Sequence, residues 1–371
     1  MQALKGCRMV YKVIGIMSGS SLDGLDLVHV QLDEVRGQWS FQILHSQCLP
    51  YSEKWLTQLR HATSLSVGDF LKLHTQYGRF LGEAVNQFIE DNNLGHNVHF
   101  IATHGHTVFH EPQNHTTWQL GDGATLAAVT SLPVISDLRS MDVALGGQGA
   151  PIVPIGDALL FGNYDYLLNI GGIANITIQH PASGASQLAF DVCPANQILN
   201  ILAEREGLMM DEGGALAESG SLLADVLDEL NAAIWYKKLP PKSLSNEVAR
   251  DLVFPHLLMS SHSNADMLHT AVWHIAHQIA EAVKLFPHNK PEATLLATGG
   301  GAFNTFLMTL VQKMLAPVNV KVVIPDADVV KYKEALVMAL IGTLRWREEE
   351  NVYSSVTGAS NNSIGGALWI G

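Results

Sequence analysis

Residues 13–32 contain two apolar runs joined by a short glycine-bearing turn, a pattern compatible with few local structures. The run VIGIM ends in SGSS, the turn signal DG follows, and a second β-rich run extends from residue 25 to 32. Two such runs around a small polar turn predict a β-hairpin. Glycine lets the backbone approach a ligand and direct N–H groups at an anion. The stretch therefore favours either a phosphate-binding hairpin or an ordinary buried hairpin.

Length, charge and cysteine content exclude several classes of protein. At 371 residues the chain is expected to form two domains. Its net charge of −13 argues against nucleic acid or an anionic membrane surface as partner, although a nucleotide can still bind. The three cysteines have no CxxC spacing, no apolar run is long enough to span a membrane, and the N-terminus lacks an apolar leader. We expect a cytoplasmic protein.

An internal repeat organises the rest of the chain. A second glycine-turned hairpin is predicted at residues 166–177, and a third glycine turn, 299–301, follows a buried strand at 293–297. Three such loops converge on one nucleotide only if two halves face each other across a cleft. The predicted fold is therefore α/β, a two-domain actin-like ATPase (ribonuclease H-like) fold with a central nucleotide cleft. We expect domain I at 11–140 plus about 345–371 and domain II at 141–344, with the Gly/Pro-rich segment 141–154 as the crossover.

Other segments place polar groups at the ends of predicted elements. Residues 66–91 have helical periodicity and a capping serine, Ser66. A strand at 98–103 leads into His104-Gly105-His106, and a strand at 187–190 leads to Asp191. An aspartate at this position suits either a general base or a helix N-cap.

The ordered set of motifs resembles the anhydro-N-acetylmuramic acid kinases over essentially the whole chain. The matching motifs are MSGSSLDGLD at 17–26, SDLR at 136–139, GGQGAP at 146–151, NIGGIAN at 169–175, PPKS at 240–243, TGGGAFN at 298–304 and VTGAS at 356–360. The resemblance implies an ATP-dependent enzyme that hydrates and opens the 1,6-anhydro ring of 1,6-anhydro-N-acetylmuramic acid and phosphorylates O6. The product is N-acetylmuramic acid 6-phosphate, made during peptidoglycan recycling. The cofactors implied are ATP and Mg²⁺, and the assembly implied is a homodimer.

By motif match the resemblance also assigns site residues. Asp191 is the implied catalytic base, and His104, Arg139 and Glu334 are implied sugar-binding residues. The implied ATP-binding residues are Gly19, Ser20, Ser21, Leu22, Asp23, Gly24, Leu25, Asp26, Gly171, Gly172, Gly299, Gly300 and Gly301. Asp23 or Asp26 is suited to hold a divalent cation through water. No direct protein metal site is predicted.

Three motifs depart from the family pattern. The usual DTGPxN is here DVCPAN at 191–196, so a hydroxyl and a glycine are lost. The usual SHGQT is THGHT at 103–107, and the basic GRE after PPKS is replaced by LSNE at 244–247. These departures predict a divergent branch with the same activity and leave substrate tolerance open.

Each candidate side chain also has a structural alternative. The histidines near His104 lack zinc spacing, so sugar contact is weighed for His104 and a structural role for the others. Arg139 suits a carboxylate of the sugar or an interface ion pair, and Glu334 suits the sugar or a solvated helix face. Cys193 is expected to be a small buried hydrophobe.

Two other functions compete with the leading hypothesis. One is a related sugar kinase on another hexose, and the other is an Hsp70-like ATP-binding module. The module is disfavoured because no substrate-binding segment follows the two predicted ATPase halves.

Overall fold

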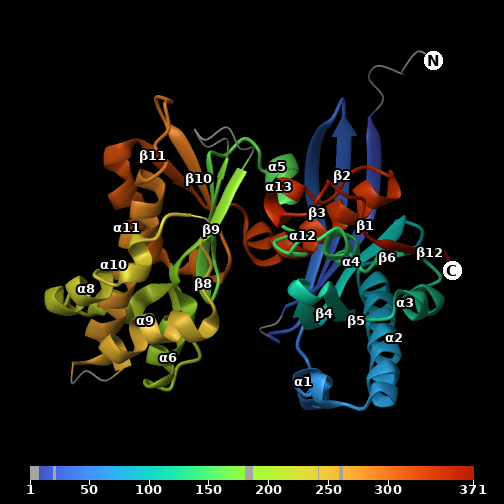
Figure 1. The fold of residues 1–371 in the computed structure, drawn as a ribbon, viewed down its shortest axis with the longest axis horizontal. Coiled ribbons are helices and arrows are strands. Elements are labelled where there is room, and N and C mark those ends of the chain that lie inside the picture. The colour runs from blue at the N-terminus through green and yellow to red at the C-terminus, as the bar shows by residue number, and fades with distance from the viewer. Residues whose placement is uncertain (1–7, 20–21, 180–186, 241, 259–261) are drawn as a thin grey trace. The chain divides into compact units, whose positions relative to one another are not determined.

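The computed structural model describes residues 8–19, 22–179, 187–240, 242–258 and 262–371 (Figure 1). The chain divides into unit 1, Met1–Leu160 with Tyr332–Gly371, and unit 2, Phe161–Lys331. These bounds differ from the expected domains, because residues 141–160 and 332–344 group with unit 1. The segment 141–154 therefore groups with unit 1, which the chain leaves only after Leu160; the helix at its start, Ser140–Ala144, packs against the strand Thr116–Leu120 of that unit.

Unit 1 is built on a mixed sheet whose strand order is β12-β6-β4-β1-β2-β3, with β5 paired to β4. Strands β1, β2 and β3 are antiparallel neighbours, whereas β4 runs parallel to both β1 and β6. The strands are β1 Met9–Ser18, β2 Leu25–Val35, β3 Gln38–Leu49, β4 Phe100–Glu111, β5 Thr116–Leu120, β6 Val134–Ser136 and β12 Ala367–Trp369. The predicted first hairpin is thus β1–β2.

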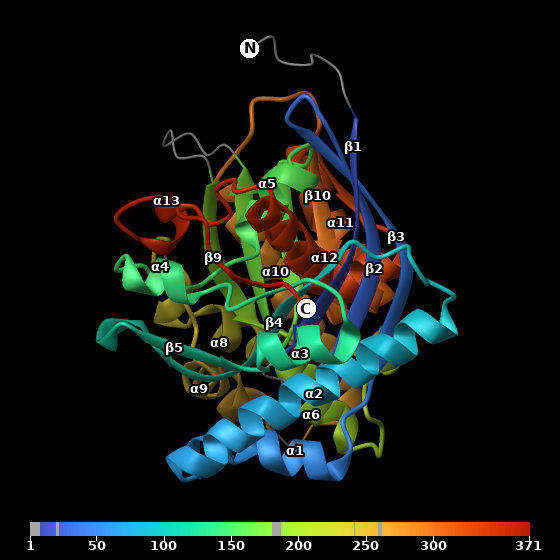
Figure 2. The same cartoon turned by 90° about the vertical axis from the view of Figure 1, so that its right-hand side faces the viewer.

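Helices cover both faces of the first sheet. The helices of unit 1 are α1 Glu53–Arg60, α2 Val67–Asp91, α3 Gly123–Thr130, α4 Ser140–Ala144, α5 Pro154–Leu160, the part of α12 (Ala327–Trp346) from Tyr332 on, and α13 Ser354–Thr357. Ser66 caps α2 through a hydrogen bond from the Asp69 N–H, as its sequence predicts. In the turned view, α1 and α3 lie beside the long α2 (Figure 2).

Side-chain alternation along β1 separates the two faces of this sheet. Ile14 and Ile16 belong to a core shared with α1, α2 and α3. At Gly15, between them, the side-chain position faces the other side of the sheet. An added Cβ there would lie 2.1 Å from the carbonyl oxygen of Ala335 on α12, Ala327–Trp346. The long helix α12 therefore approaches the sheet closely on the second face.

Unit 2 repeats the same sheet topology. Its order is β11-β10-β7-β8-β9, in which β7, β8 and β9 are antiparallel neighbours and β10 runs parallel to β7 and β11. The strands are β7 Tyr166–Ile170, β8 Ile173–Gln179, β9 Gln187–Pro194, β10 Ala293–Thr298 and β11 Val320–Val323. The order β9-β8-β7-β10-β11 corresponds to β3-β2-β1-β4-β6 of unit 1, so the predicted internal repeat is present.

The helices of unit 2 enclose one hydrophobic core with its sheet. They are α6 Asn196–Glu204, α7 Ala215–Ser219, α8 Ala224–Asn231, α9 Asn246–Leu258, α10 Asn264–Lys284 and α11 Thr305–Leu315. α10 contributes a nearly continuous apolar face, from Met267 to Val283, and packs against α6, α8, α11 and β9. Two units with this repeated strand order and direction have the α/β architecture of actin-like ATPases, as predicted.

Two strands extend beyond their predicted bounds, and one long helix has an irregular start. β4 continues through His104 and His106 to Glu111, because β5 pairs with its second half. β9 continues past residue 190 to Pro194, so Asp191 lies within a strand and not after one. α12 begins at Ala327 and contains a non-helical residue, Tyr332, at the border between the units. Among the described helices none is long and apolar enough to cross a membrane.

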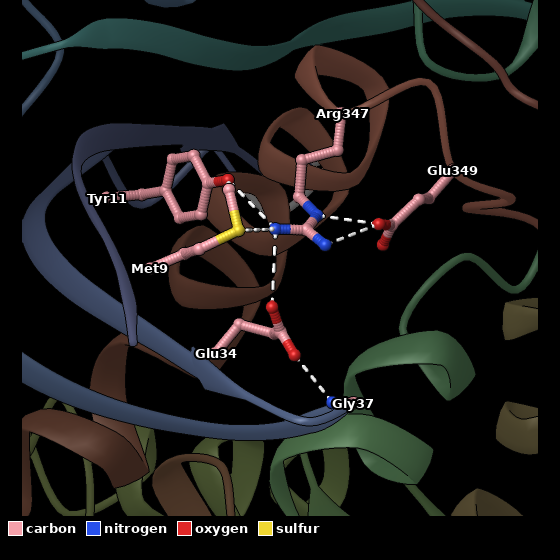
Figure 3. A network of polar contacts seen from close by, with 6 residues as sticks. All are labelled: Met9, Tyr11, Glu34, Gly37, Arg347 and Glu349. Carbon is pink, nitrogen blue, oxygen red and sulfur yellow. Dashed lines mark hydrogen bonds and ion pairs between the residues drawn. The ribbon is translucent and has the colours of Figure 1, made fainter. Parts of the chain in front are cut away.

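A polar network secures the chain that follows α12 to the sheet of unit 1 (Figure 3). The Arg347 guanidinium donates to the Tyr11 hydroxyl at 2.9 Å and forms ion pairs with Glu34 at 3.4 Å and Glu349 at 2.6 Å. It also lies over the rings of Tyr11 and Trp39. These contacts raise the pKa of Arg347, chiefly through the hydrogen bond to Glu349. They hold the C-terminal segment of unit 1 against β1, β2 and β3.

Candidate active site

The tip of the first hairpin is shaped by a turn and by close packing. The Leu22 N–H donates to the Gly19 carbonyl at 3.2 Å, and Leu22 adopts a left-handed φ of 61°. At Gly24 an added Cβ would lie 2.6 Å from Cys48 Sγ and 2.9 Å from the Leu49 carbonyl oxygen. Glycine is therefore required at residue 24 by β3, whatever the hairpin binds. Ser20 and Ser21 lie outside the described residues.

A buried chain of hydroxyl groups anchors the base of this hairpin. Ser18 Oγ lies 3.0 Å from His106 Nδ1 and accepts a hydrogen bond from the Tyr51 hydroxyl at 2.7 Å. The hydroxyls of Tyr51 and Tyr77 are also 2.7 Å apart. Burial lowers the pKa of His106 to about 4, so the ring is neutral near pH 7. The network joins β1 to β4, to α2 and to the segment after β3.

Acidic groups gather beside this hairpin within unit 1. Desolvation raises the pKa of Asp26, on β2, and the charge of the neighbouring Asp23 raises it further. The Glu334 side chain, on α12, keeps solvent-accessible surface but is closely surrounded by protein, so desolvation, together with the charge of Asp26, raises its pKa. The charges of Arg139 and Lys333 oppose that rise. The structure thus places Asp23, Asp26, Arg139 and Glu334 in one electrostatic neighbourhood.

His104 and Arg139 form a half-buried pair at the end of this sheet. Arg139 Nε donates to His104 Nε2 at 2.7 Å, and Arg139 Nη1 donates to the Gly149 carbonyl. An arginine always donates, so His104 carries its proton on Nδ1 and donates to the Gly105 carbonyl at 2.9 Å. Burial and the Arg139 charge lower the pKa of His104 to about 3. Both ring nitrogens of His104 therefore have protein partners.

Asp142 joins two of the sequence motifs behind this pair. It is 1% exposed, and its carboxylate accepts the Gly149 N–H at 2.7 Å and the Thr357 hydroxyl at 2.6 Å. The Thr357 carbonyl in turn accepts the Gln148 N–H at 2.9 Å. The GGQGAP and VTGAS segments are thus held together by one buried carboxylate.

In unit 2 the second and third glycine turns meet. The carbonyls of Gly171 and Gly172 accept N–H groups from the start of α6, including the Asn196 N–H at 3.1 Å. Gly299 has a φ of 79°, and an added Cβ there would lie 2.8 Å from the Ile170 carbonyl oxygen. An added Cβ on Gly301 would lie 2.2 Å from Ile170 Cγ2. Side chains are therefore excluded where the loop after β10 packs against the β7–β8 turn.

Asp191 projects from an irregular part of β9. The register of β8 and β9 shifts so that Asn175 faces Asp191 and Ala174 faces Cys193, which leaves Val192 as a bulge. Asp191 Oδ2 accepts hydrogen bonds from Ser243 Oγ at 3.0 Å and from the Leu244 N–H at 2.7 Å. α6 has Ala195 as its N-cap, so Asp191 does not cap it. The carboxylate is oriented through one oxygen and leaves Oδ1 outside these contacts.

The PPKS segment is fixed by its lysine. Lys242 Nζ lies 4.2 Å from the centre of the Trp235 ring and donates to the Tyr236 carbonyl at 3.3 Å. The Lys242 carbonyl accepts the Asp191 N–H at 3.0 Å. Burial raises the pKa of the Cys193 thiol well above its usual range, which fits a buried hydrophobe. Pro241 lies outside the described residues.

Residues distant in sequence complete these sites, and no local pattern predicts their partners. Tyr51 and Tyr77 carry no motif, and the role of Asp142 depends on Thr357, far along the chain. The match of Ser243 to the PPKS motif was the one available signal for a partner of Asp191. No group of three His, Cys, Asp or Glu side chains suited to hold a metal occurs within the described part of the chain.

Comparison with known proteins gives a consistent match along the chain. The family model described as anhydro-N-acetylmuramic acid kinase matches residues 11–371. A relative of that name from Francisella tularensis subsp. novicida is 33% identical, covering 96% of this chain and 97% of the relative. Another from Bacillus cereus (strain B4264) is 30% identical and covers 96% of each chain.

Solved structures resemble the chain more distantly. The activator of the 2-hydroxyisocaproyl-CoA dehydratase from Clostridium difficile with bound ADPNP gives a TM-score of 0.42 at 14% identity. That alignment covers 92% of this chain and 96% of the activator. The family assignment rests on the sequence matches, which extend over nearly the full length. The chain belongs to the anhydro-N-acetylmuramic acid kinase family.

Proposed function

We propose that Asp191 is the general base of the reaction that this ATP-dependent sugar kinase catalyses on 1,6-anhydro-N-acetylmuramic acid. The observation that carries the proposal is the orientation of its carboxylate by Ser243 and the Leu244 N–H. A base must hold its free oxygen toward the water whose proton it accepts. Two donors on Oδ2 leave Oδ1 for that task.

The proposed reaction joins hydration and phosphoryl transfer. Asp191 accepts a proton from water as the water oxygen bonds to C1 and the C1–O6 bond breaks. The carboxylate stabilises the positive character at the anomeric carbon. O6 then bonds to the γ-phosphorus of ATP and ADP leaves, so that N-acetylmuramic acid 6-phosphate forms. Backbone N–H groups of the glycine turns stabilise the negative charge of the phosphates through hydrogen bonds.

The sugar is proposed to contact unit 1 through Arg139 and Glu334. The described contacts of Arg139 use Nε and one donor of Nη1, so the guanidinium keeps donors for the lactyl carboxylate of the sugar. His104 is proposed to act through Arg139, because both its ring nitrogens already have partners. Glu334 is proposed to accept from a sugar hydroxyl.

ATP is proposed to bind the glycine turns of both units. Gly19, Leu22, Asp23, Gly24, Leu25 and Asp26, with Ser20 and Ser21, form the first phosphate turn; Gly171 and Gly172 form the second; and Gly299, Gly300 and Gly301 face the adenosine. Asp23 and Asp26 fit Mg²⁺, because the two neighbouring carboxylates repel each other and a divalent cation between them would offset that repulsion. When bound, Mg²⁺ would supply charge neutralisation at the phosphates. A homodimer and a cytoplasmic location remain predictions.

Substitution of the base tests this mechanism. In Asp191→Asn the shape is kept and the proton acceptor is lost, so turnover should fall about 10²–10⁴-fold while ATP binding persists. In ¹⁸O-water the wild type should place the heavy oxygen at C1 and the phosphate at O6. Asp228→Asn, on the exposed face of α8 in the same unit, is the matched control and should keep wild-type turnover. Full activity of Asp191→Asn, or label on the phosphate, would contradict the assignment.

A further inference from the structure

Helix α12 presents one acid from an otherwise buried segment. After the non-helical Tyr332 the helix enters unit 1, and residues 335–344 are all buried. Lys333 is also buried, whereas Glu334 between Lys333 and Ala335 is exposed. The position of the Glu334 carboxyl therefore depends on how the helix residues on either side of it are packed.

The first neighbour is fixed by a buried ion pair. Lys333 Nζ lies 2.7 Å from Asp157 Oδ1, and the two side chains are 8% and 5% exposed. Asp157 belongs to α5, the last helix before the chain first leaves unit 1, and Lys333 is the second residue after it returns. A buried charge needs its partner in good geometry, so the pair sets how the start of this α12 segment is seated on α5.

The following residues are fixed by close backbone packing. Ala335 lies against Gly15 of β1, where an added Cβ would be 2.1 Å from the Ala335 carbonyl oxygen. Val337 lies against Gly156 of α5, where an added Cβ would be 2.3 Å from Val337 Cγ2. Residues 333, 335 and 337 are thus each held by β1 or α5, which leaves the Glu334 carboxyl in the neighbourhood of Asp26 and Arg139.

We propose that Asp157 and Lys333 form a positioning pair that holds Glu334 in place for the anhydro sugar, without touching the sugar themselves. The inference rests on the proposed function, in which Glu334 contacts that sugar. Loss of the pair lets the first turn of the segment shift, and a displacement of a binding group by about 1 Å can lower the rate about 100-fold.

The experiment compares single and double variants in the full-length protein. Lys333→Met leaves Asp157 buried without its cation and should lower the melting temperature. The double variant Asp157→Leu/Lys333→Met replaces the ion pair by apolar side chains and should regain much of that stability. In both variants kcat/KM for the anhydro sugar should fall about 10- to 100-fold with a raised KM for the sugar, while KM for ATP stays unchanged. A merely structural role would lower kcat alone by reducing the folded fraction.

Two further variants separate the possible failures. Lys284→Met removes the exposed ion pair with Glu281 on α10 and should leave all kinetic constants unchanged. Glu334→Gln should raise KM for the sugar; wild-type kinetics there would contradict the proposed sugar contact itself. If Glu334→Gln is impaired but the double variant shows wild-type sugar kinetics, the positioning role is overturned. If the double variant does not fold, the folded fraction of Lys333→Met decides: an unchanged KM for the sugar there overturns the positioning role, and a raised one supports it.

Discussion

Buried histidines hold neutral rings in both units. His29, His104, His106 and His274 are at most 5% exposed, and burial lowers their pKa values to about 4, 3, 4 and 3. The neutral His274 ring has a hydrogen-bond partner for each nitrogen: Nδ1 lies 2.7 Å from Asn231 Oδ1, and Nε2 lies 2.9 Å from the Tyr236 hydroxyl. Such groups bind a proton in the unfolded chain at a higher pH than in the folded one.

This difference predicts acid lability. The stability supplied by each neutral ring is complete above the unfolded pKa, about 6.5, and is lost as pH falls toward the folded value. Each histidine can contribute a slope of up to about 1.4 kcal/mol per pH unit in that window. Melting temperature should therefore fall from pH 7 to pH 5. The melting temperature of His274→Asn should fall less steeply between these pH values. That of His96→Asn, whose side chain is on the surface, should fall as in the wild type. Equal slopes for all three proteins would refute the explanation.

At the scale of elements, the β1–β2 and β7–β8 hairpins share a design. Each has a glycine-bearing turn between antiparallel strands at the centre of its sheet. In unit 2 the turn packs against the loop after β10, so two of the three predicted glycine motifs are in contact. In unit 1 the strand that leads into the turn is held by the Ser18 network. The strand that leads into the first turn and the second turn itself are therefore each held by contacts within their own unit.

Replacing Gly19 by valine tests the first turn. The branched side chain should keep the backbone from approaching a phosphate, so ATP binding measured by calorimetry should be abolished in a folded protein. Gly68→Val is the matched control, because an added Cβ in that first turn of α2 meets nothing within 4 Å. Normal ATP affinity in a folded Gly19→Val protein would mean that the hairpin does not bind phosphate.

At the scale of the whole molecule, the chain passes between two units with the same sheet topology. The proposed reaction uses Asp191 from unit 2 and the groups around Arg139 from unit 1 on one substrate. If both groups act on one substrate, we expect the units to close on it, and such closure would also exclude bulk water from the reaction.

Closure is the measurable consequence. Small-angle scattering should give a smaller radius of gyration when a nonhydrolysable ATP analogue and the anhydro sugar are both added. The Asp191→Asn variant should close in the same way, since it keeps the shape of the base. An unchanged radius of gyration in the wild type would count against closure.

Local sequence signals predicted much of the fold. Turn chemistry located both hairpins, the capping serine located the start of α2, and the repeat anticipated the two equivalent sheets. The ordered motifs also identified the family, because they extend along the chain from residue 17 to residue 360. These features depend on neighbouring residues or on linear order, which a sequence displays directly.

Tertiary structure decided what depends on distant residues. Pairing with β5 extended β4, and a bulge placed Asp191 inside β9. The contacts of Ser18 with Tyr51 and His106, and of Lys333 with Asp157, join separate elements. No periodicity records such partners, because they are set when strands and helices pack and each buried polar group must find a counterpart. Local patterns and linear motif order thus specified the two hairpins, the start of α2 and the family, whereas packing set the extent of β4 and β9 and the partners that hold the site residues.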